Sequence, residues 1–143
     1  MTDSIDTNII LRCILGDVPE QRHLAARLLR TPNTTHYLSS QALLECIYVM
    51  EIVEEIPREE IVDLLNFFLT RYSDVLEYNQ KITALAFPLY LARPKLSWAD
   101  CALTAEAEFA HHEPLFTFDK KLATQLPHAK LLKETRDAIK EKE

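Results

Sequence analysis

The stretch Leu115-Phe116-Thr117-Phe118-Asp119-Lys120-Lys121 decides the fold expected for this chain. Its first half predicts a short strand, which ends at an aspartate where a helix begins. Three further acids, Asp6, Glu45 and Asp100, lie in comparable places elsewhere in the sequence. Residues so far apart meet only if the fold gathers the carboxyl ends of its strands, as a parallel sheet does. The pattern therefore predicts an α/β fold with an acidic cleft.

Strand and helix signals alternate along all 143 residues, without an internal repeat or linker. Such alternation predicts one domain, residues 1–143, built as a three-layer α/β/α sandwich around a parallel sheet. Gly16 should end the first helix, and Asp17 should cap the second. A charged helix is expected to close the chain over residues 133–143. Short strands, with helices between them, are expected near residues 1–5, 36–38, 75–78, 115–118 and 129–132.

Composition limits what the chain can bind. The net charge is −6, so the sequence has no basic footprint for holding a long nucleic acid. One glycine cannot build a glycine-rich phosphate loop, so cations would have to contact any phosphate.

Cys13, Cys46 and Cys101 lack disulfide or zinc spacing and are expected to be buried thiols in a reducing cytosol. No signal peptide or membrane-spanning run is seen, which predicts a cytoplasmic protein.

Asp6, Asp100 and Asp119 each have a structural explanation. Aspartate is favoured at helix N-caps, and an acid in the first helical turn gains roughly 0.3–1 kcal/mol from the helix dipole. Ser97 and Asp100 also have the spacing of a capping box. Taken singly, each acid is therefore explained by capping.

Glu45 differs, because it follows the first turn of its helix and lies inside the apolar run 42–50. Gln41 is the one strong polar neighbour at helical spacing. A charged carboxylate in an apolar surrounding has to be paired, bound to a metal or neutralised. We therefore expect Glu45 to meet a metal ion or an Arg or Lys from elsewhere in the chain.

The four acids together predict more than any one of them. Four carboxylates in one cleft would repel one another unless a cation lay between them. Oxygen ligands of this kind suit Mg²⁺, for which Mn²⁺ can substitute. Such an ion can activate water, position a phosphate and stabilise a leaving oxygen. The set therefore predicts a metal-dependent nuclease that hydrolyses phosphodiesters by in-line attack of water.

Four motifs in this sequence resemble those of the PIN-domain ribonucleases, and most closely those of the small single-domain toxins of VapBC toxin–antitoxin pairs. They span roughly residues 5–132 and occur in the family's order and at its spacings. The segment before the fourth acid departs from the family, because 111–114 reads His-His-Glu-Pro and lacks a glycine. The motifs are Asp6-Thr7-Asn8-Ile9-Ile10-Leu11-Arg12, Ser39-Ser40 with Leu44-Glu45, Ala99-Asp100 with Leu103 and Ala105, and Thr117-Phe118-Asp119-Lys120.

The resemblance implies a five-stranded parallel sheet flanked by helices, with a Mg²⁺ site made by the four acids. Asp6 and Asp100 are implied as the direct metal ligands. Glu45 and Asp119 are implied to complete the site directly or through water. The implied partners are an RNA substrate, a cognate antitoxin and a second copy of the chain, and no membrane is implied.

Three neighbours of these acids are candidates for orienting the substrate. In the family, the positions of Asn8 and Thr117 help to orient carboxylates, water or phosphate. Arg12 follows Asp6 on the same helix and could meet a phosphate or serve only the surface.

Other functions stay open from the sequence. A PIN-type nuclease of RNA processing or turnover would need no antitoxin. An aspartyl phosphotransferase would need acids two apart, whereas Asp3 and Asp6 are three apart, and a phospho-receiver domain would need an acid pair and a late lysine. A non-catalytic binding module would use the acids only as caps. Apolar helix faces around 47–56 and 61–69 exceed what one sheet face covers, which predicts a partner surface.

Overall fold

The structure is a computed structural model that describes residues 1–132. They belong to two compact units, an N-terminal unit of Met1–Asn79 and a C-terminal unit that begins at Gln80. The closing helix expected over 133–143 lies outside the described residues. The expectation of a single domain stays a prediction.

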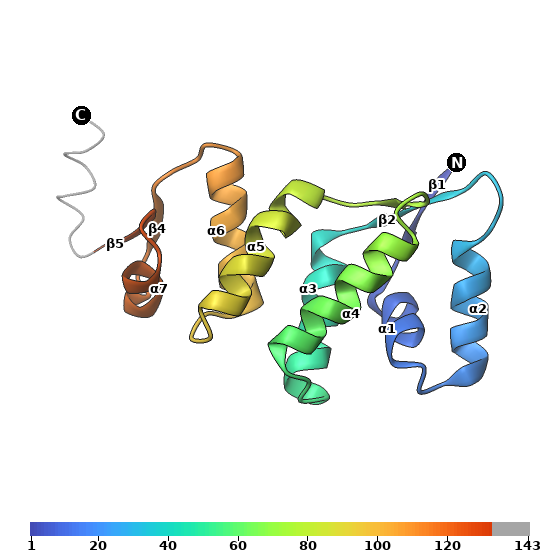
Figure 1. The fold of residues 1–143 in the computed structure, drawn as a ribbon. Helices are drawn as coiled ribbons and strands as arrows, with labels where there is room; N and C mark the ends of the chain where they lie inside the picture. Colours follow the sequence, from blue (N-terminus) through green and yellow to red (C-terminus); the bar gives the residue numbers. More distant parts are fainter. Residues whose placement is uncertain (133–143) are drawn as a thin grey trace. The chain divides into compact units, whose positions relative to one another are not determined.

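The N-terminal unit combines a three-stranded sheet with helices (Figure 1). The strands are in the order β1-β2-β3 and all pairs are parallel. The last residues of the first two strands, Ile5 and Leu38, are directly paired. The helices that follow these strands therefore start at the same edge of the sheet. The elements are β1 Thr2–Ile5, α1 Thr7–Leu15, α2 Pro19–Leu29, β2 Thr35–Leu38, α3 Ser40–Tyr48, the π-helix η1 Val49–Val53, α4 Arg58–Arg71 and β3 Leu76–Glu77.

Strand β1 forms although three of its four residues are polar. Two of these polar side chains, those of Thr2 and Asp3, find a partner on β2. Thr2 and Thr35 share a hydrogen bond of 2.8 Å between their hydroxyls, and Asp3 Oδ1 lies 2.5 Å from His36 Nδ1. Such cross-strand pairs stabilise a strand that has few apolar residues. Ile5 alone of this strand is buried.

Gly16 ends α1 as expected, with a φ of 62° that side-chain-bearing residues rarely adopt. A Cβ at this position would also lie 3.0 Å from Arg22 Nη1, a tight contact that a small shift of the flexible Arg22 side chain would relieve. The expected cap by Asp17 is wrong. Val18 is the N-cap residue of α2, and Asp17 instead forms an ion pair with Arg12 at 3.2 Å.

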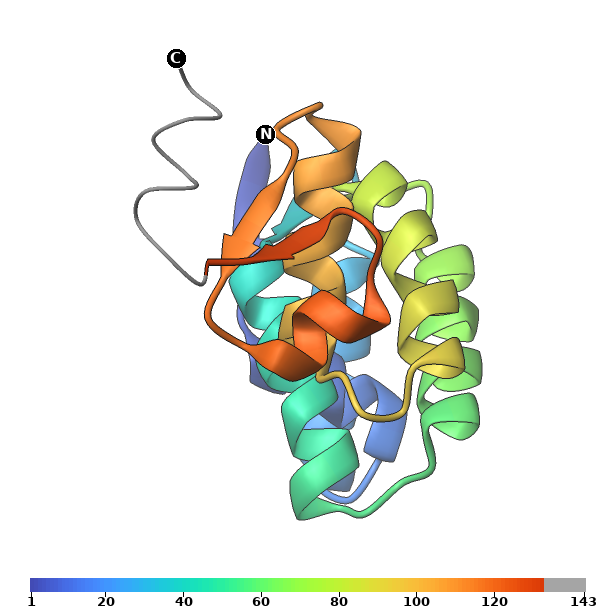
Figure 2. The same ribbon diagram turned by 90° about the vertical axis from the view of Figure 1, so that its left-hand side faces the viewer.

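The C-terminal unit contains helices α5 and α6 and a two-stranded parallel sheet of β4 and β5 (Figures 1 and 2). Trp98 joins α6 to α5, because its ring lies 5.2 Å from that of Phe87 and 5.6 Å from that of Tyr90. Aromatic pairs at these separations add to the area they bury. The elements are α5 Gln80–Ala92, α6 Trp98–Phe109, β4 Leu115–Thr117, α7 Lys120–Gln125 and β5 Ala129–Leu131.

The chain turns at His111 before β4, in the segment where the family commonly has a glycine. Its φ is 58°, in the left-handed region that glycine favours. Histidine is among the few other residues enriched in that region.

The predicted fold class is confirmed, because the chain is α/β and all five strands in the described residues have parallel partners. They form one sheet of three strands and one of two. None of the helices within residues 1–132 has both the length and the apolar character needed to cross a membrane.

Candidate metal centre

Asp6 follows β1 directly and is the N-cap residue of α1. Its Oδ1 accepts hydrogen bonds from the Asn8 and Ile9 N–H groups at 3.0 and 3.4 Å. Its Oδ2 accepts none from the described residues. The predicted cap is therefore confirmed, and it leaves one exposed carboxylate oxygen without a hydrogen bond.

Glu45 lies beside the same helix N-terminus. The Thr7 hydroxyl donates to Glu45 Oε2 at 2.9 Å, and the Gln41 side chain donates to Oε1 at 3.5 Å. The contact follows from the sheet, because α1 and α3 begin after neighbouring parallel strands. Thr7 is adjacent to Asp6 in the chain, so this hydrogen bond holds Glu45 beside the helix N-terminus that Asp6 caps.

The expected apolar surrounding of Glu45 is wrong. Its side chain is exposed, while its neighbours Cys46 and Ile47 are buried. The run 42–50 is apolar because α3 buries one face, and Glu45 lies on the other. No Arg or Lys pairs with Glu45 among the described residues, so its partners there are neutral.

Asn8 and Arg12 differ in how their side chains are used. The Asn8 side chain is exposed and makes no hydrogen bond within residues 1–132. Arg12 Nη1 pairs with Asp17, and its Nε donates to Gln21 Oε1 at 2.6 Å. These contacts occupy two of the three guanidinium nitrogens of Arg12, and its contact with a phosphate stays a prediction.

Asp100 forms a full capping box with Ser97 at the start of α6. Ser97 Oγ accepts from the Asp100 N–H at 3.1 Å, and Asp100 Oδ2 accepts from the Ser97 N–H at 3.2 Å. Asp100 Oδ1 accepts no hydrogen bond from the described residues. The predicted capping box is confirmed, and it occupies only one carboxylate oxygen.

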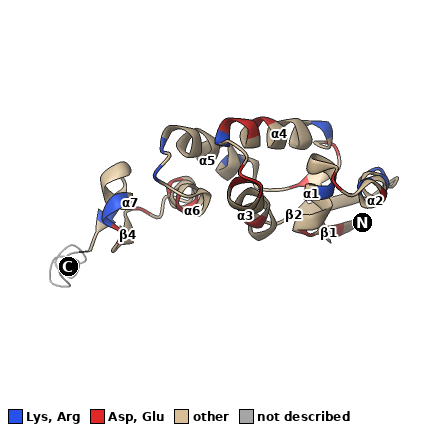
Figure 3. Ribbon diagram, turned by 90° about the horizontal axis from the view of Figure 1, so that it is seen from below, with Lys and Arg blue, Asp and Glu red and all other residues tan. Residues whose placement is uncertain are grey.

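Asp119 is the N-cap residue of α7 and has the same arrangement as Asp6. Its Oδ1 accepts from the Lys121 and Leu122 N–H groups at 2.9 and 3.3 Å. Thr117 Oγ1 accepts from the Asp119 N–H at 2.9 Å, which fixes the turn between β4 and α7. Lys120 and Lys121 follow at the start of α7 (Figure 3), so the strand end carries both an acid and two cations.

Each unit thus supplies two of the four predicted acids. Asp6 and Glu45 belong to the N-terminal unit, and Asp100 and Asp119 to the C-terminal unit. Within residues 1–132, neither unit by itself gathers three or more His, Cys, Asp or Glu side chains into a metal-binding group. Convergence of the two pairs stays a prediction.

The donor atoms fit a divalent cation. All four groups are carboxylates, the hard oxygen ligands that Mg²⁺ and Mn²⁺ prefer. None of the four forms an ion pair among the described residues, and Asp6, Asp100 and Asp119 each keep one oxygen free of hydrogen bonds there. Thr7 was not predicted as a site residue, although its hydroxyl donates a hydrogen bond to the remaining acid, Glu45. Its position directly after Asp6 was the available signal.

Comparison with curated proteins finds no match. Among solved structures, the chain resembles the crystal structure of VapBC2 from Rickettsia felis bound to a DNA fragment from their promoter. The two are 21% identical, the alignment covers 92% of this chain and 98% of that chain, and the TM-score is 0.38. The PIN domain family matches residues 4–125, which include all four acids. PIN domains are generally nucleases, and this chain belongs to the PIN-domain family.

Proposed function

We propose that this protein is a Mg²⁺-dependent endoribonuclease in which Asp6, Glu45, Asp100 and Asp119 hold the metal. The observation that carries the proposal is the contact between Thr7 and Glu45 beside Asp6. Capping explains Asp6, but it does not explain why a second carboxylate from another helix is held at the same N-terminus without a cation. Two such carboxylates repel each other unless a positive charge joins them.

The chain's own groups would have distinct tasks. Asp6 and Asp100 would bind the ion with the oxygens that their caps leave free. Glu45 is already oriented by Thr7, and Asp119 by its helix N-terminus. A bound Mg²⁺ would supply positive charge to the phosphate and would make a bound water more acidic.

Two polar side chains would contact the substrate side of the site. The exposed Asn8 amide can donate to a phosphate oxygen. The Thr117 hydroxyl accepts from the Asp119 N–H and keeps its own hydrogen for a water, a carboxylate or a phosphate. Arg12 could reach a phosphate only with Nη2, because Asp17 and Gln21 occupy its other nitrogens.

Cleavage of single-stranded RNA with analysis of the product ends tests this function. We expect activity with Mg²⁺ or Mn²⁺, no activity with a chelator, and products with 5′-phosphate ends, because water attacks phosphorus and the 3′-oxygen leaves. Asp6→Asn should abolish cleavage. The control is Asp17→Asn, which should not abolish it, because Asp17 pairs with Arg12 and is not one of the four acids. Products with 2′,3′-cyclic phosphate ends would contradict the proposal, because they arise from attack by the ribose 2′-hydroxyl.

We further propose that this nuclease is the toxin of a toxin–antitoxin pair and acts on RNA in the cytoplasm. The support is the resemblance of its four motifs and its size to the small single-domain toxins. An RNA-processing nuclease would show the same chemistry, so a cellular test is needed. Expression should arrest growth, and co-expression of the product of the adjacent reading frame should restore it. Normal growth on expression of the active enzyme would favour the processing role.

A further inference from the structure

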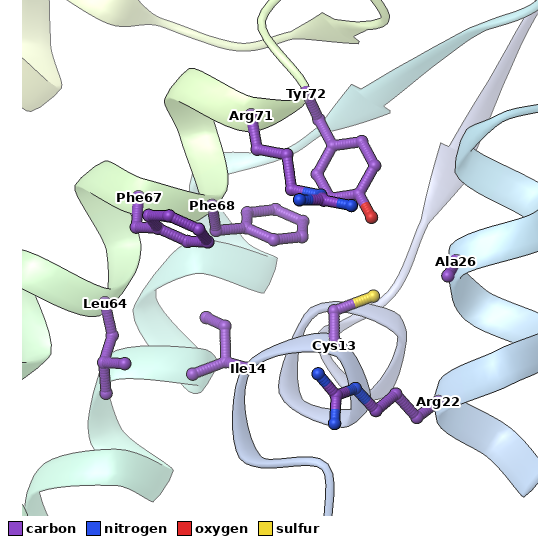
Figure 4. A pocket seen from close by; sticks show the side chains of 9 residues that line it. All are labelled: Cys13, Ile14, Arg22, Ala26, Leu64, Phe67, Phe68, Arg71 and Tyr72. Carbon is purple, nitrogen blue, oxygen red and sulfur yellow. The ribbon is translucent and has the colours of Figure 1, made fainter. Parts of the chain in front are cut away.

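A cavity of about 400 Å³ opens in the N-terminal unit among α1, α2 and α4, at the opposite end of α1 from Asp6. This volume lies in the range of small-molecule sites. Figure 4 shows side chains from all three helices around it. The lining residues are Cys13, Ile14, Arg22, Ala26, Leu64, Phe67, Phe68, Arg71 and Tyr72.

Most of the residues that line the cavity are apolar. Phe67 is notable because 69% of its surface is exposed, although the aromatic rings beside it at Phe68 and Tyr72 are buried. An exposed aromatic side chain at the mouth of a cavity can cover an apolar ligand. The Tyr72 hydroxyl and the two arginines are the strong hydrogen-bonding groups of this lining.

Two guanidinium groups face the cavity without a carboxylate partner. Neither Arg22 nor Arg71 forms an ion pair with the described residues, whereas Arg12 and Arg30 pair with Asp17 and Asp74. The lining contains no Asp or Glu. Two uncompensated cations in a chain of net charge −6 indicate that this cavity favours an anion.

Cys13 does not supply that anion. Burial raises the pKa of the Cys13 thiol, and this effect exceeds the lowering by Arg22 and Arg71. The thiol therefore stays protonated at neutral pH, and the positive charge of the arginines remains uncompensated. The effect of both arginines on Cys13 also indicates that their charges act on the same small volume.

We propose that this cavity binds a small amphipathic carboxylate, with its apolar body against Ile14, Leu64 and Phe67 and its carboxylate between Arg22 and Arg71. Guanidinium groups bind carboxylates through paired hydrogen bonds. A nucleotide fits less well, because its base would bury polar edges against the apolar side chains of Ile14, Leu64 and Phe67. The site is separate from the metal centre, and the proposal does not depend on nuclease activity.

Calorimetric titration of the full chain with octanoate, octanol and adenosine monophosphate tests the ligand class. Octanoate should bind, and octanol, which has the same chain without the charge, should bind at least about tenfold more weakly, as expected for the loss of charge-assisted hydrogen bonds. Equal binding of octanol, or adenosine monophosphate binding as well as octanoate, would overturn the proposal. So would the absence of octanoate binding.

Two further measurements test where the ligand binds: the effect of arginine substitutions on affinity, and the rate of alkylation of the Cys13 thiol. The double variant Arg22→Gln/Arg71→Gln should weaken octanoate binding by at least about tenfold. The matched control is Arg27→Gln, because Arg27 is also exposed on α2 and forms no ion pair with the described residues, but it does not line the cavity. Saturating octanoate should slow iodoacetamide alkylation of Cys13, measured by peptide mass spectrometry. If Arg27→Gln weakened octanoate binding as much as the double variant, or if bound octanoate left the alkylation rate of Cys13 unchanged, the ligand would bind elsewhere.

Discussion

Replacing Asp100 by asparagine should separate capping from metal binding, because the capping box uses only one of its two carboxylate oxygens. Asp100 Oδ2 accepts from the Ser97 N–H, while Oδ1 accepts no hydrogen bond from the described residues. An asparagine amide oxygen can accept the same hydrogen bond, but the side chain no longer carries the charge that attracts a cation. Ser97→Ala is the matched control, since it removes the reciprocal cap and leaves the acid in place.

The two variants should differ in how much stability they lose and in how they respond to metal. Asp100→Asn loses an interaction with the helix dipole worth roughly 0.3–1 kcal/mol. Ser97→Ala loses a cap worth roughly 0.5–2 kcal/mol. For a chain of this length, about 1 kcal/mol corresponds to about 4 °C in Tm. Without metal, Ser97→Ala should therefore melt at the lower temperature of the two.

Metal binding reverses this order. At a concentration one hundred times its Kd, Mn²⁺ should stabilise the wild-type protein by about 2.7 kcal/mol. If Asp100→Asn weakens the site about one hundredfold, the same concentration gives only about 0.4 kcal/mol. Ser97→Ala should keep the full gain. The assay is thermal melting of all three proteins with and without Mn²⁺, together with RNA cleavage. Full activity and full Mn²⁺ stabilisation of Asp100→Asn would show that Asp100 is only a cap.

Three further outcomes are expected. Thr7→Val should lower kcat about tenfold, because Glu45 loses a charge-assisted hydrogen bond, and Thr7→Ser should keep the wild-type kcat. A Thr7→Val variant as active as the wild type would show that Thr7 is not part of the site. Asp119→Asn should keep measurable cleavage that higher Mn²⁺ concentrations restore, and complete, metal-insensitive loss would contradict binding through water. Burial raises the pKa of Cys46 from 9.0 to about 12, so the folded state retains a proton that the unfolded state loses above pH 9. The free energy of unfolding, measured with urea, should therefore fall between pH 9 and 10 by about 1 kcal/mol more than in Cys46→Ala, and parallel pH profiles of the two proteins would contradict this.

The sequence alone predicted the local structure around three of the four acids. Asp6 and Asp119 cap helices, and Ser97 with Asp100 forms a capping box, because each of these hydrogen bonds joins atoms at most three residues apart. Gly16 ended α1 for a similar reason, since its positive φ is a property of one residue. The parallel strands were also predictable, because alternating strands and helices require crossover connections.

Contacts between residues far apart in the chain could not be predicted from the sequence. Glu45 was expected in an apolar surrounding, yet it is exposed and held by Thr7, 38 positions earlier. Which face of α3 is buried depends on the elements packed against it, and residue periodicity within a short apolar run does not distinguish its faces. Asp17 was expected to cap α2, but Arg12 lies close enough to pair with it instead.

The paired polar residues of β1 and the cavity between α1, α2 and α4 depend on tertiary structure alone. Asp3 finds His36 only because β1 and β2 pair in one parallel register. Arg22 and Arg71 face one cavity only because α2 and α4 pack on either side of α1. The sequence by itself determined the strands and the caps formed by Asp6, Asp100 and Asp119, because short-range hydrogen bonds and backbone preferences act within a few residues. Tertiary structure decided which side chains from different elements meet, because that depends on strand register and helix packing.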